Sequence, residues 1–251
     1  MHRRQKKPYA VIFAIIVAFV VYGAVRDMDR LKNPPEAERT VVRFNYADDA
    51  GDFARLPLDT SPVVINIGKL TKDENGDYSL TASDIEAVTL PQREVNLLVT
   101  LSDLPQSVSA FGDMVDREIT HWKRKNNKIV EIMLDWQSDT PPDVEKLGIF
   151  AVGLRTHLKQ DYWVGLFLRR GWFESDPAQL DWPHSGPDGI RSYVYYLDEA
   201  RRDGESLDET LDALDAYKLS YTLFAKELPP KKEAEHLIKA HSLFQGFVLP
   251  R

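Results

Sequence analysis

Cysteine is absent from all 251 residues of the chain, and this absence excludes several kinds of site at once. Without a thiol there is no cysteine nucleophile, no thiolate zinc site and no iron–sulfur cluster. A disulfide scaffold is excluded as well, and the content of 43% hydrophobic and 28% charged residues is that of an ordinary folded globular protein. The lack of cysteine is compatible with an oxidising compartment but does not require one.

An excess of basic residues is also missing. The chain has 32 Lys and Arg against 39 Asp and Glu, a net charge of −7. Beyond residue 30 the balance is 26 basic to 37 acidic residues, a net charge of −11. Nucleic-acid-binding proteins usually present a basic face, so we expect no nucleic-acid partner.

Several catalytic and cofactor motifs are absent too. The six histidines show no HxxH or HExxH spacing, so we expect no metal site. No GxSxG or SxxK motif supplies an activated serine, and no Walker loop or glycine-rich fingerprint supplies a phosphate site. We therefore expect no cofactor.

The amino terminus carries a targeting or membrane signal. A basic cluster at residues 2–7 precedes 17 uncharged residues, Tyr9–Val25, which as a helix span about 26 Å. Such a segment is either a cleaved signal peptide or an uncleaved signal anchor; Val21-Tyr22-Gly23 is a poor cleavage site, which favours the anchor.

This pattern predicts four regions. Residues 1–8 form a cytoplasmic basic tail, 9–25 one transmembrane helix, 26–39 a linker and 40–251 a folded domain. Positive charge stays on the cytoplasmic side. In a bacterium the chain is then a single-pass protein of the inner membrane with its carboxyl-terminal domain in the periplasm.

Short β-branched or apolar runs recur along the domain and predict eight strands. They are Val41–Tyr46, Val63–Ile67, Val95–Leu101, Ile129–Leu134, Trp163–Leu168, Tyr193–Leu197, Leu219–Phe224 and Phe244–Leu249. The sixth run is ambiguous, since its sequence is equally compatible with a helix.

Helical patterns lie between the later strands. One apolar stripe comprises Val108, Phe111, Val115, Ile119 and Trp122, and a second comprises Leu147, Phe150, Leu154 and Leu158. A capping box formed by Ser206 and Glu209 starts a third helix, and Pro230 opens a fourth. Alternating strands and helices predict a compact (β/α)₈ TIM-like barrel with some short or missing helices. An open doubly wound sheet is the alternative.

Chemistry in such barrels lies at the carboxyl ends of the strands. Polar residues there include Asn45 and Asp48, Lys69, Asp103, the run Asp135-Trp136-Gln137-Ser138-Asp139, Arg169 with Arg170, and Glu227. Acids beside aromatic rings suit a carbohydrate, although strand-end acids often only begin an exposed loop. Asp135 stands out because it ends the apolar run IVEIMLD; it is either functional or paired with Arg169, Arg170 or Lys69.

The loop after the fifth strand gathers Trp172, Phe173, Trp182 and His184 among glycine, proline and acids. It is either a lid that stacks on sugars or an apolar plug over the barrel mouth.

The stretch 129–170 resembles an uncharacterised bacterial family with a glycoside-hydrolase-like barrel. In that family the fourth strand ends in an Asp-rich turn, and a helix with the pattern matched here by Phe150, Leu154, Arg155 and Leu158 leads to the fifth strand. The wider similarity is to chitinase-type barrels, whose fourth strand ends in DxxDxDxE with the last Glu as general acid. On that motif Asp135 takes the last Asp and Gln137 takes the place of the acid.

The resemblance implies a barrel that acts on or binds carbohydrate. Because Gln137 cannot donate the proton, chitinase chemistry does not carry over. If the domain is an enzyme, Asp135 or Asp139 works with a second carboxylate, for which Glu199, Glu227, Asp48 and Asp103 are candidates.

Two hypotheses therefore stand. The first is a periplasmic protein, a degenerate glycosidase, that binds a polysaccharide or an envelope protein; the second is an active glycoside hydrolase. Expected catalytic residues are Asp135, Asp139 and Glu227, and expected binding residues are Asn45, Asp48, Trp136, Gln137, Arg169, Trp172 and Trp182.

Overall fold

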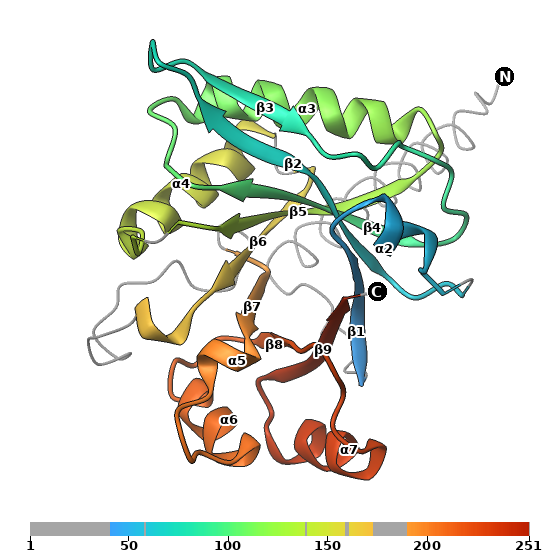
Figure 1. Cartoon of the computed structure of the whole chain (residues 1–251), viewed down its shortest axis with the longest axis vertical. Coiled ribbons are helices and arrows are strands. Elements are labelled where there is room, and N and C mark those ends of the chain that lie inside the picture. The colour runs from blue at the N-terminus through green and yellow to red at the C-terminus, as the bar shows by residue number, and fades with distance from the viewer. Residues whose placement is uncertain (1–40, 58, 139, 159–160, 173–189, 251) are drawn as a thin grey trace, which may run out of the picture. The chain divides into compact units, whose positions relative to one another are not determined.

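Eight parallel strands close into a barrel in the computed structural model of the chain (Figure 1), which describes residues 41–57, 59–138, 140–158, 161–172 and 190–250. The barrel strands are β1 (Val42–Ala47), β2 (Val63–Lys72), β4 (Glu94–Leu101), β5 (Lys128–Trp136), β6 (Trp163–Leu168), β7 (Ser192–Tyr196), β8 (Tyr221–Phe224) and β9 (Phe244–Pro250). Strand β1 pairs with β9 on one side and with β2 on the other, which closes the sheet. The predicted TIM-like barrel is confirmed, and the open sheet is wrong.

All eight predicted strands are present, including the ambiguous sixth. The sequence after Arg191 forms β7 as far as Tyr196, and helix α5 (Leu197–Ala200) follows without a break. Both interpretations of this segment therefore apply, each to its own half. The abrupt change places Tyr196 at the carboxyl end of a strand.

One strand was not predicted. Strand β3 (Tyr78–Ala82) pairs antiparallel with β2 outside the barrel. Only Tyr78 and Leu80 are half-buried against the core, and the other three residues are exposed, so the strand has only a short apolar face. The signal was the turn before it, which contains Asn75-Gly76, a typical hairpin dipeptide.

Helices connect most of the strands: α2 (Ala50–Ala54), α3 (Val108–Lys123), α4 (Val144–His157), α6 (Leu207–Asp215), α7 (Lys231–Ala240) and the short 3₁₀ helix η1 (Arg170–Trp172). The predicted apolar stripe of α3 is buried except for the half-buried Val108, and that of α4 is wholly buried. The capping box of α6 is formed as predicted. The first crossover has only the five-residue α2, and the described residues between β2 and β4 contain β3 instead of a helix.

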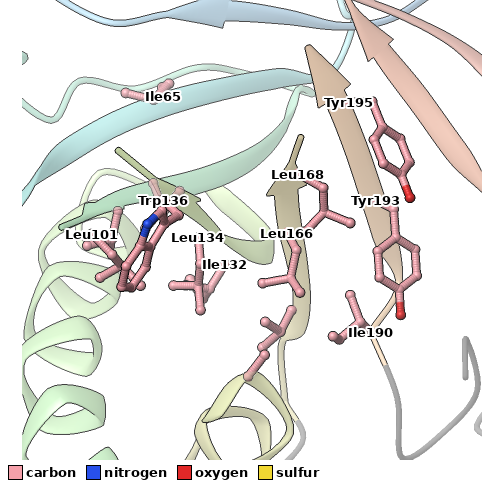
Figure 2. Packing of buried hydrophobic residues seen from close by; sticks show 14 of the residues in the cluster. Ile65, Leu101, Ile132, Leu134, Trp136, Leu166, Leu168, Ile190, Tyr193 and Tyr195 are labelled. Carbon is pink, nitrogen blue, oxygen red and sulfur yellow. The ribbon is translucent and has the colours of Figure 1, made fainter. Parts of the chain in front are cut away.

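Strand alternation divides the buried residues into two sets. The smaller set fills the barrel interior: Phe44, Tyr46, Val64, Leu98, Met133, Phe167, Val194 and Val248, with Tyr196 and Phe224 packed against it. The larger set lies between the strands and the helices; Figure 2 shows part of it, with Trp136 beside Leu101 and Leu134. The interior set extends to the carboxyl ends of the strands, where the polar residues of the candidate site lie.

The predicted membrane segment, residues 9–25, lies outside the described residues, as do the predicted tail and linker. Among the residues described, no helix is both long enough and apolar enough to cross a membrane.

Candidate functional site

Asp135 is a buried carboxylate at the carboxyl end of the barrel. It follows Met133 by two positions on β5 and therefore faces the interior, and its side chain is fully buried. Its Oδ2 atom accepts hydrogen bonds from Tyr196 Oη and from Gln137 Nε2, each at 2.7 Å. Its Oδ1 atom has no partner within the chain as described.

This environment shifts the titration of Asp135. Burial raises the pKa of the carboxyl from 3.8 to about 6, while the hydrogen bonds from Tyr196 and Gln137 and the charge of Arg169 limit the rise. A carboxyl group with this pKa exchanges its proton near neutral pH, which suits general acid–base chemistry.

Arg169 follows the last residue of β6 and lies close to this group. Its Nη1 forms an ion pair with Glu199 Oε1 at 3.0 Å. The guanidinium also lies 5.5 Å from the ring centre of Tyr196 and 6.0 Å from that of Trp172. The structure thus pairs Arg169 with Glu199 in place of Asp135, while the buried Nε of Arg169 has no partner among the described residues.

A second carboxylate lies at the same end of the barrel. Asp48 is exposed just after β1, and its Oδ1 accepts from Tyr46 Oη at 2.8 Å and from Asn66 Nδ2 at 2.7 Å. Asn66 also approaches Thr100 Oγ1 at 3.5 Å, and Thr100 is paired in register with Asp135. The charge of Asp48 raises the pKa of Asp135, so the two carboxylates influence each other electrostatically.

Four aromatic rings form the floor of this end of the barrel. Tyr46, Phe167, Tyr196 and Phe224 come from four different strands, and their ring centres lie 5.1–6.3 Å apart for every pair described. Burial raises the pKa of both tyrosines far above the usual range, and the neighbouring carboxylates raise it further. Both hydroxyls therefore stay protonated and donate.

Two expected binding residues lie elsewhere. Asn45 is buried and alternates with the inward-facing Phe44 and Tyr46, so it points toward the outer layer. Trp136 packs in the outer layer, and its indole N–H donates to the carbonyl of Thr140 at 2.9 Å. Neither side chain points toward Asp135, because each residue is adjacent to an inward-facing residue on its strand and therefore faces outward.

The remaining expected residues divide into three groups. Trp172 is half-buried beside Arg169, as described above. Glu227 is exposed after β8, and the structure as described gives it no hydrogen bond or ion pair. Asp139 and Trp182 lie outside the described residues.

Two of the other candidate carboxylates are engaged. Glu199 holds Arg169, as described above. Asp103 accepts a hydrogen bond from Tyr78 Oη at 2.7 Å and lies 3.5 Å from Lys72 Nζ, so its partners lie on the β2–β3 hairpin. Asp48 is therefore the candidate that the structure associates with Asp135.

Three contributors to the site were not among the expected catalytic or binding residues: Tyr46, Asn66 and Tyr196. Each is an inward-facing residue close to the carboxyl end of its strand, and each donates to Asp48 or Asp135. Strand alternation was the available signal: Tyr196 follows the inward Val194 by two positions, and Asn66 follows Val64 by two.

No group of three or more His, Cys, Asp or Glu side chains in the described ranges is placed to hold a metal ion. No protein-family model matches the chain, and no curated protein matches it either. The geometry of the barrel mouth therefore carries the functional argument.

Proposed function

We propose that this protein binds a glycan at the carboxyl-terminal mouth of its barrel and does not cleave it. In this proposal the barrel stands in the periplasm and is tethered to the inner membrane by residues 9–25. The ligand-binding set is Asp48, Asp135, Gln137, Arg169 and Trp172, with the tyrosines Tyr46 and Tyr196 beneath it.

One observation carries the proposal: Gln137 donates its amide N–H to Asp135. In the resembled chitinase-type motif this position holds the general acid. An amide at that place has no proton to transfer, but it donates and accepts hydrogen bonds as sugar hydroxyl groups require. The contact thus joins the side chains at the motif's last Asp and acid positions, and the second of them supplies no acid.

The aromatic residues support the same interpretation. Sugar rings present apolar faces that stack on aromatic side chains, and their hydroxyls bond to nearby polar groups. At this mouth Trp172 and Tyr196 flank the guanidinium of Arg169. Asp48 and Asp135 each accept a hydrogen bond from a tyrosine hydroxyl. A glycan matches this combination of rings and hydrogen-bonding groups.

The test is a binding measurement on the full-length chain in a mild detergent. We expect chitotetraose or cellotetraose to bind by titration calorimetry with no release of shorter sugars. Asp135→Asn should weaken that binding at least tenfold. Asp116→Asn changes the same charge at an exposed position on α3 and should leave binding unchanged. Absence of binding to both oligomers would refute the proposal.

Active glycoside hydrolysis is the second candidate, because Asp135 has a pKa of about 6 and an ionisable neighbour in Asp48. Glycosidases use a pair of carboxyl groups, one of which has a raised pKa and acts as the general acid. Hydrolysis of either tetramer by the wild-type chain, lost in Asp48→Asn, would establish this candidate and overturn the first.

Gln137→Glu separates the two candidates further. In a degenerate glycosidase the substitution returns an acid to the vacant position of the motif, so hydrolysis should appear where the wild-type chain has none. In an active enzyme that relies on Asp135 and Asp48, a third carboxylate beside Asp135 should instead lower the rate.

Membrane tethering is tested separately from binding. Alkaline phosphatase fused after Arg251 is active only in the periplasm, so a fusion of the full chain should be active and should sediment with the inner membrane. Release of the fusion into the soluble periplasmic fraction would indicate a cleaved signal peptide instead of an anchor.

A further inference from the structure

The two carboxylates of the mouth are held by neutral donors. Asp48 accepts from Tyr46 and Asn66, and Asp135 accepts from Tyr196 and Gln137. Neither takes part in an ion pair with a described cation. Two negative charges at one end of a barrel, without a cation bonded to either, favour a ligand that brings positive charge.

Two cations near these carboxylates are engaged elsewhere. Arg169 pairs with Glu199 at 3.0 Å, and at the rim Lys226 pairs with Asp198 at 3.3 Å. Arg169 acts on Asp135 through its charge alone, since no hydrogen bond joins them in the described structure. The local balance of these groups is therefore negative.

Two buried polar atoms here lack partners: the acceptor Oδ1 of Asp135 and the donor Nε of Arg169. Buried polar atoms of native proteins are nearly always bonded, so each such exception calls for an explanation. A ligand with a charged N–H donor and a neighbouring hydroxyl acceptor would satisfy both. The aromatic floor beneath them also attracts cations through its ring faces.

We infer that the mouth selects a glycan bearing a protonated primary amine, such as a de-N-acetylated hexosamine, with the ammonium group bound between Asp135 and Asp48. This inference rests on the proposed glycan-binding function and adds the class of sugar. An N-acetylated sugar has no charge to offer these groups. A uronic acid or phosphorylated sugar is repelled by them.

Access to Asp135 involves Gln137. Asp135 is fully buried, and of its two donors only Gln137 is exposed. In this inference the Gln137 side chain rotates away as the ammonium approaches. Its amide then bonds to the sugar, and the backbone stays in place because the Gln137 N–H remains bonded to the carbonyl of Leu101 at 2.7 Å.

The experiment compares two tetramers that differ only in acetylation. Full-length chain in a mild detergent is titrated near pH 7 with the glucosamine tetramer and with chitotetraose. We expect the amine form to bind at least tenfold more tightly and its advantage to shrink as salt rises, since salt screens charge. Asp48→Asn and Asp135→Asn should each reduce the preference.

The control distinguishes a local site from the general attraction of a cation to an acidic protein. Asp116→Asn removes the same charge at an exposed position on α3, outside the proposed site, and should keep the full preference. An equal loss in this variant would overturn the inference. Equal or tighter binding of chitotetraose would overturn it too while leaving the proposed function intact, whereas failure of both tetramers to bind would overturn both.

Discussion

The hydroxyl of Tyr196 donates to Oδ2 of Asp135 at 2.7 Å, and this bond joins the end of β7 to the end of β5 across β6. Tyr196 stays protonated because burial and the nearby carboxylate raise its pKa. The same bond favours the ionised form of Asp135 and so limits the rise of its pKa. Tyr196 thereby shifts the titration of the central carboxyl toward the ionised form, against the larger effect of burial.

Removal of the Tyr196 hydroxyl should therefore raise the pKa of Asp135 above about 6. A hydrogen bond to a charged group contributes about 2 kcal/mol, so Tyr196→Phe should shift the titration upward by about 1.5 units. Carboxyl-carbon NMR of labelled aspartate measures the shift. An unchanged or lower midpoint would contradict the role of this bond, and Tyr78→Phe, at the β2–β3 hairpin, is the control that should not move it.

The burial of Asp135 should also make stability depend on pH. Its folded pKa of about 6 lies above the ordinary 3.8, so the unfolded chain loses the proton first. The stability that this group contributes is complete below pH 3.8 and is lost as pH rises through 6. A shift of about two units corresponds to about 3 kcal/mol.

Asp135→Asn removes this dependence. Relative to the wild type, the variant should gain stability between pH 4 and pH 7 by an amount of that order, measured as the difference in urea-unfolding free energy at each pH. A difference that stays constant across this range would show that Asp135 does not titrate as described.

His241, at the end of α7, joins that helix to α6. Its Nδ1 lies 3.0 Å from Asp215 and its Nε2 lies 3.1 Å from Asp208, so both ring nitrogens donate only when the ring is charged. Burial lowers the pKa of His241, but the hydrogen bonds to both aspartates outweigh it and the pKa is raised. This contribution to stability is complete below the ordinary 6.5 and is lost as pH rises through the folded pKa.

We therefore expect His241→Asn to lower the free energy of unfolding by about 2 kcal/mol at pH 6 and by less at pH 9. Thermal unfolding at both pH values measures this. His236→Asn replaces an exposed histidine on the same helix and should have little effect at either pH. An equal loss at the two pH values would mean that His241 acts through packing alone.

Gly112 permits the close contact between α3 and α4. A methyl group at this position would overlap the ring of His157, which bonds to Asp113 at 3.0 Å. Gly112→Ala should therefore destabilise the protein by about 1–3 kcal/mol. Gly171→Ala, where a methyl group would meet nothing within 4 Å, should be nearly neutral in the same urea titration. Similar midpoints for the two variants would contradict this packing.

Particular residues show where sequence reasoning succeeded. The helix stripes of α3 and α4 and the capping box of Ser206 and Glu209 were predictable because a helix of this kind is specified by neighbours three or four positions apart. Asp135 was identified for a similar local reason, since a carboxylate at the end of an apolar strand is conspicuous. Strand β3 was missed because its apolar face is limited to Tyr78 and Leu80, and the rest of the strand is exposed.

The mouth was harder to predict. Asn45 and Trp136 were expected there beside Asp135, yet strand alternation turns both outward. The choice between adjacent residues depends on which set faces the interior, and on strands that are apolar on both sides the hydrophobic pattern does not distinguish them.

The sequence by itself determined the order of the eight barrel strands and of the helices α3, α4, α6 and α7, the negative charge and the candidate Asp135, because each depends on composition or on residues close together in the chain. Only the tertiary structure decided that β1 pairs with β2 and β9 to close the barrel. Closure brings Tyr46 and Asp48 to the same mouth as Tyr196 and Asp135, about 90 to 150 positions further along the chain. Contacts of that separation depend on the register of every intervening strand, which no local pattern encodes.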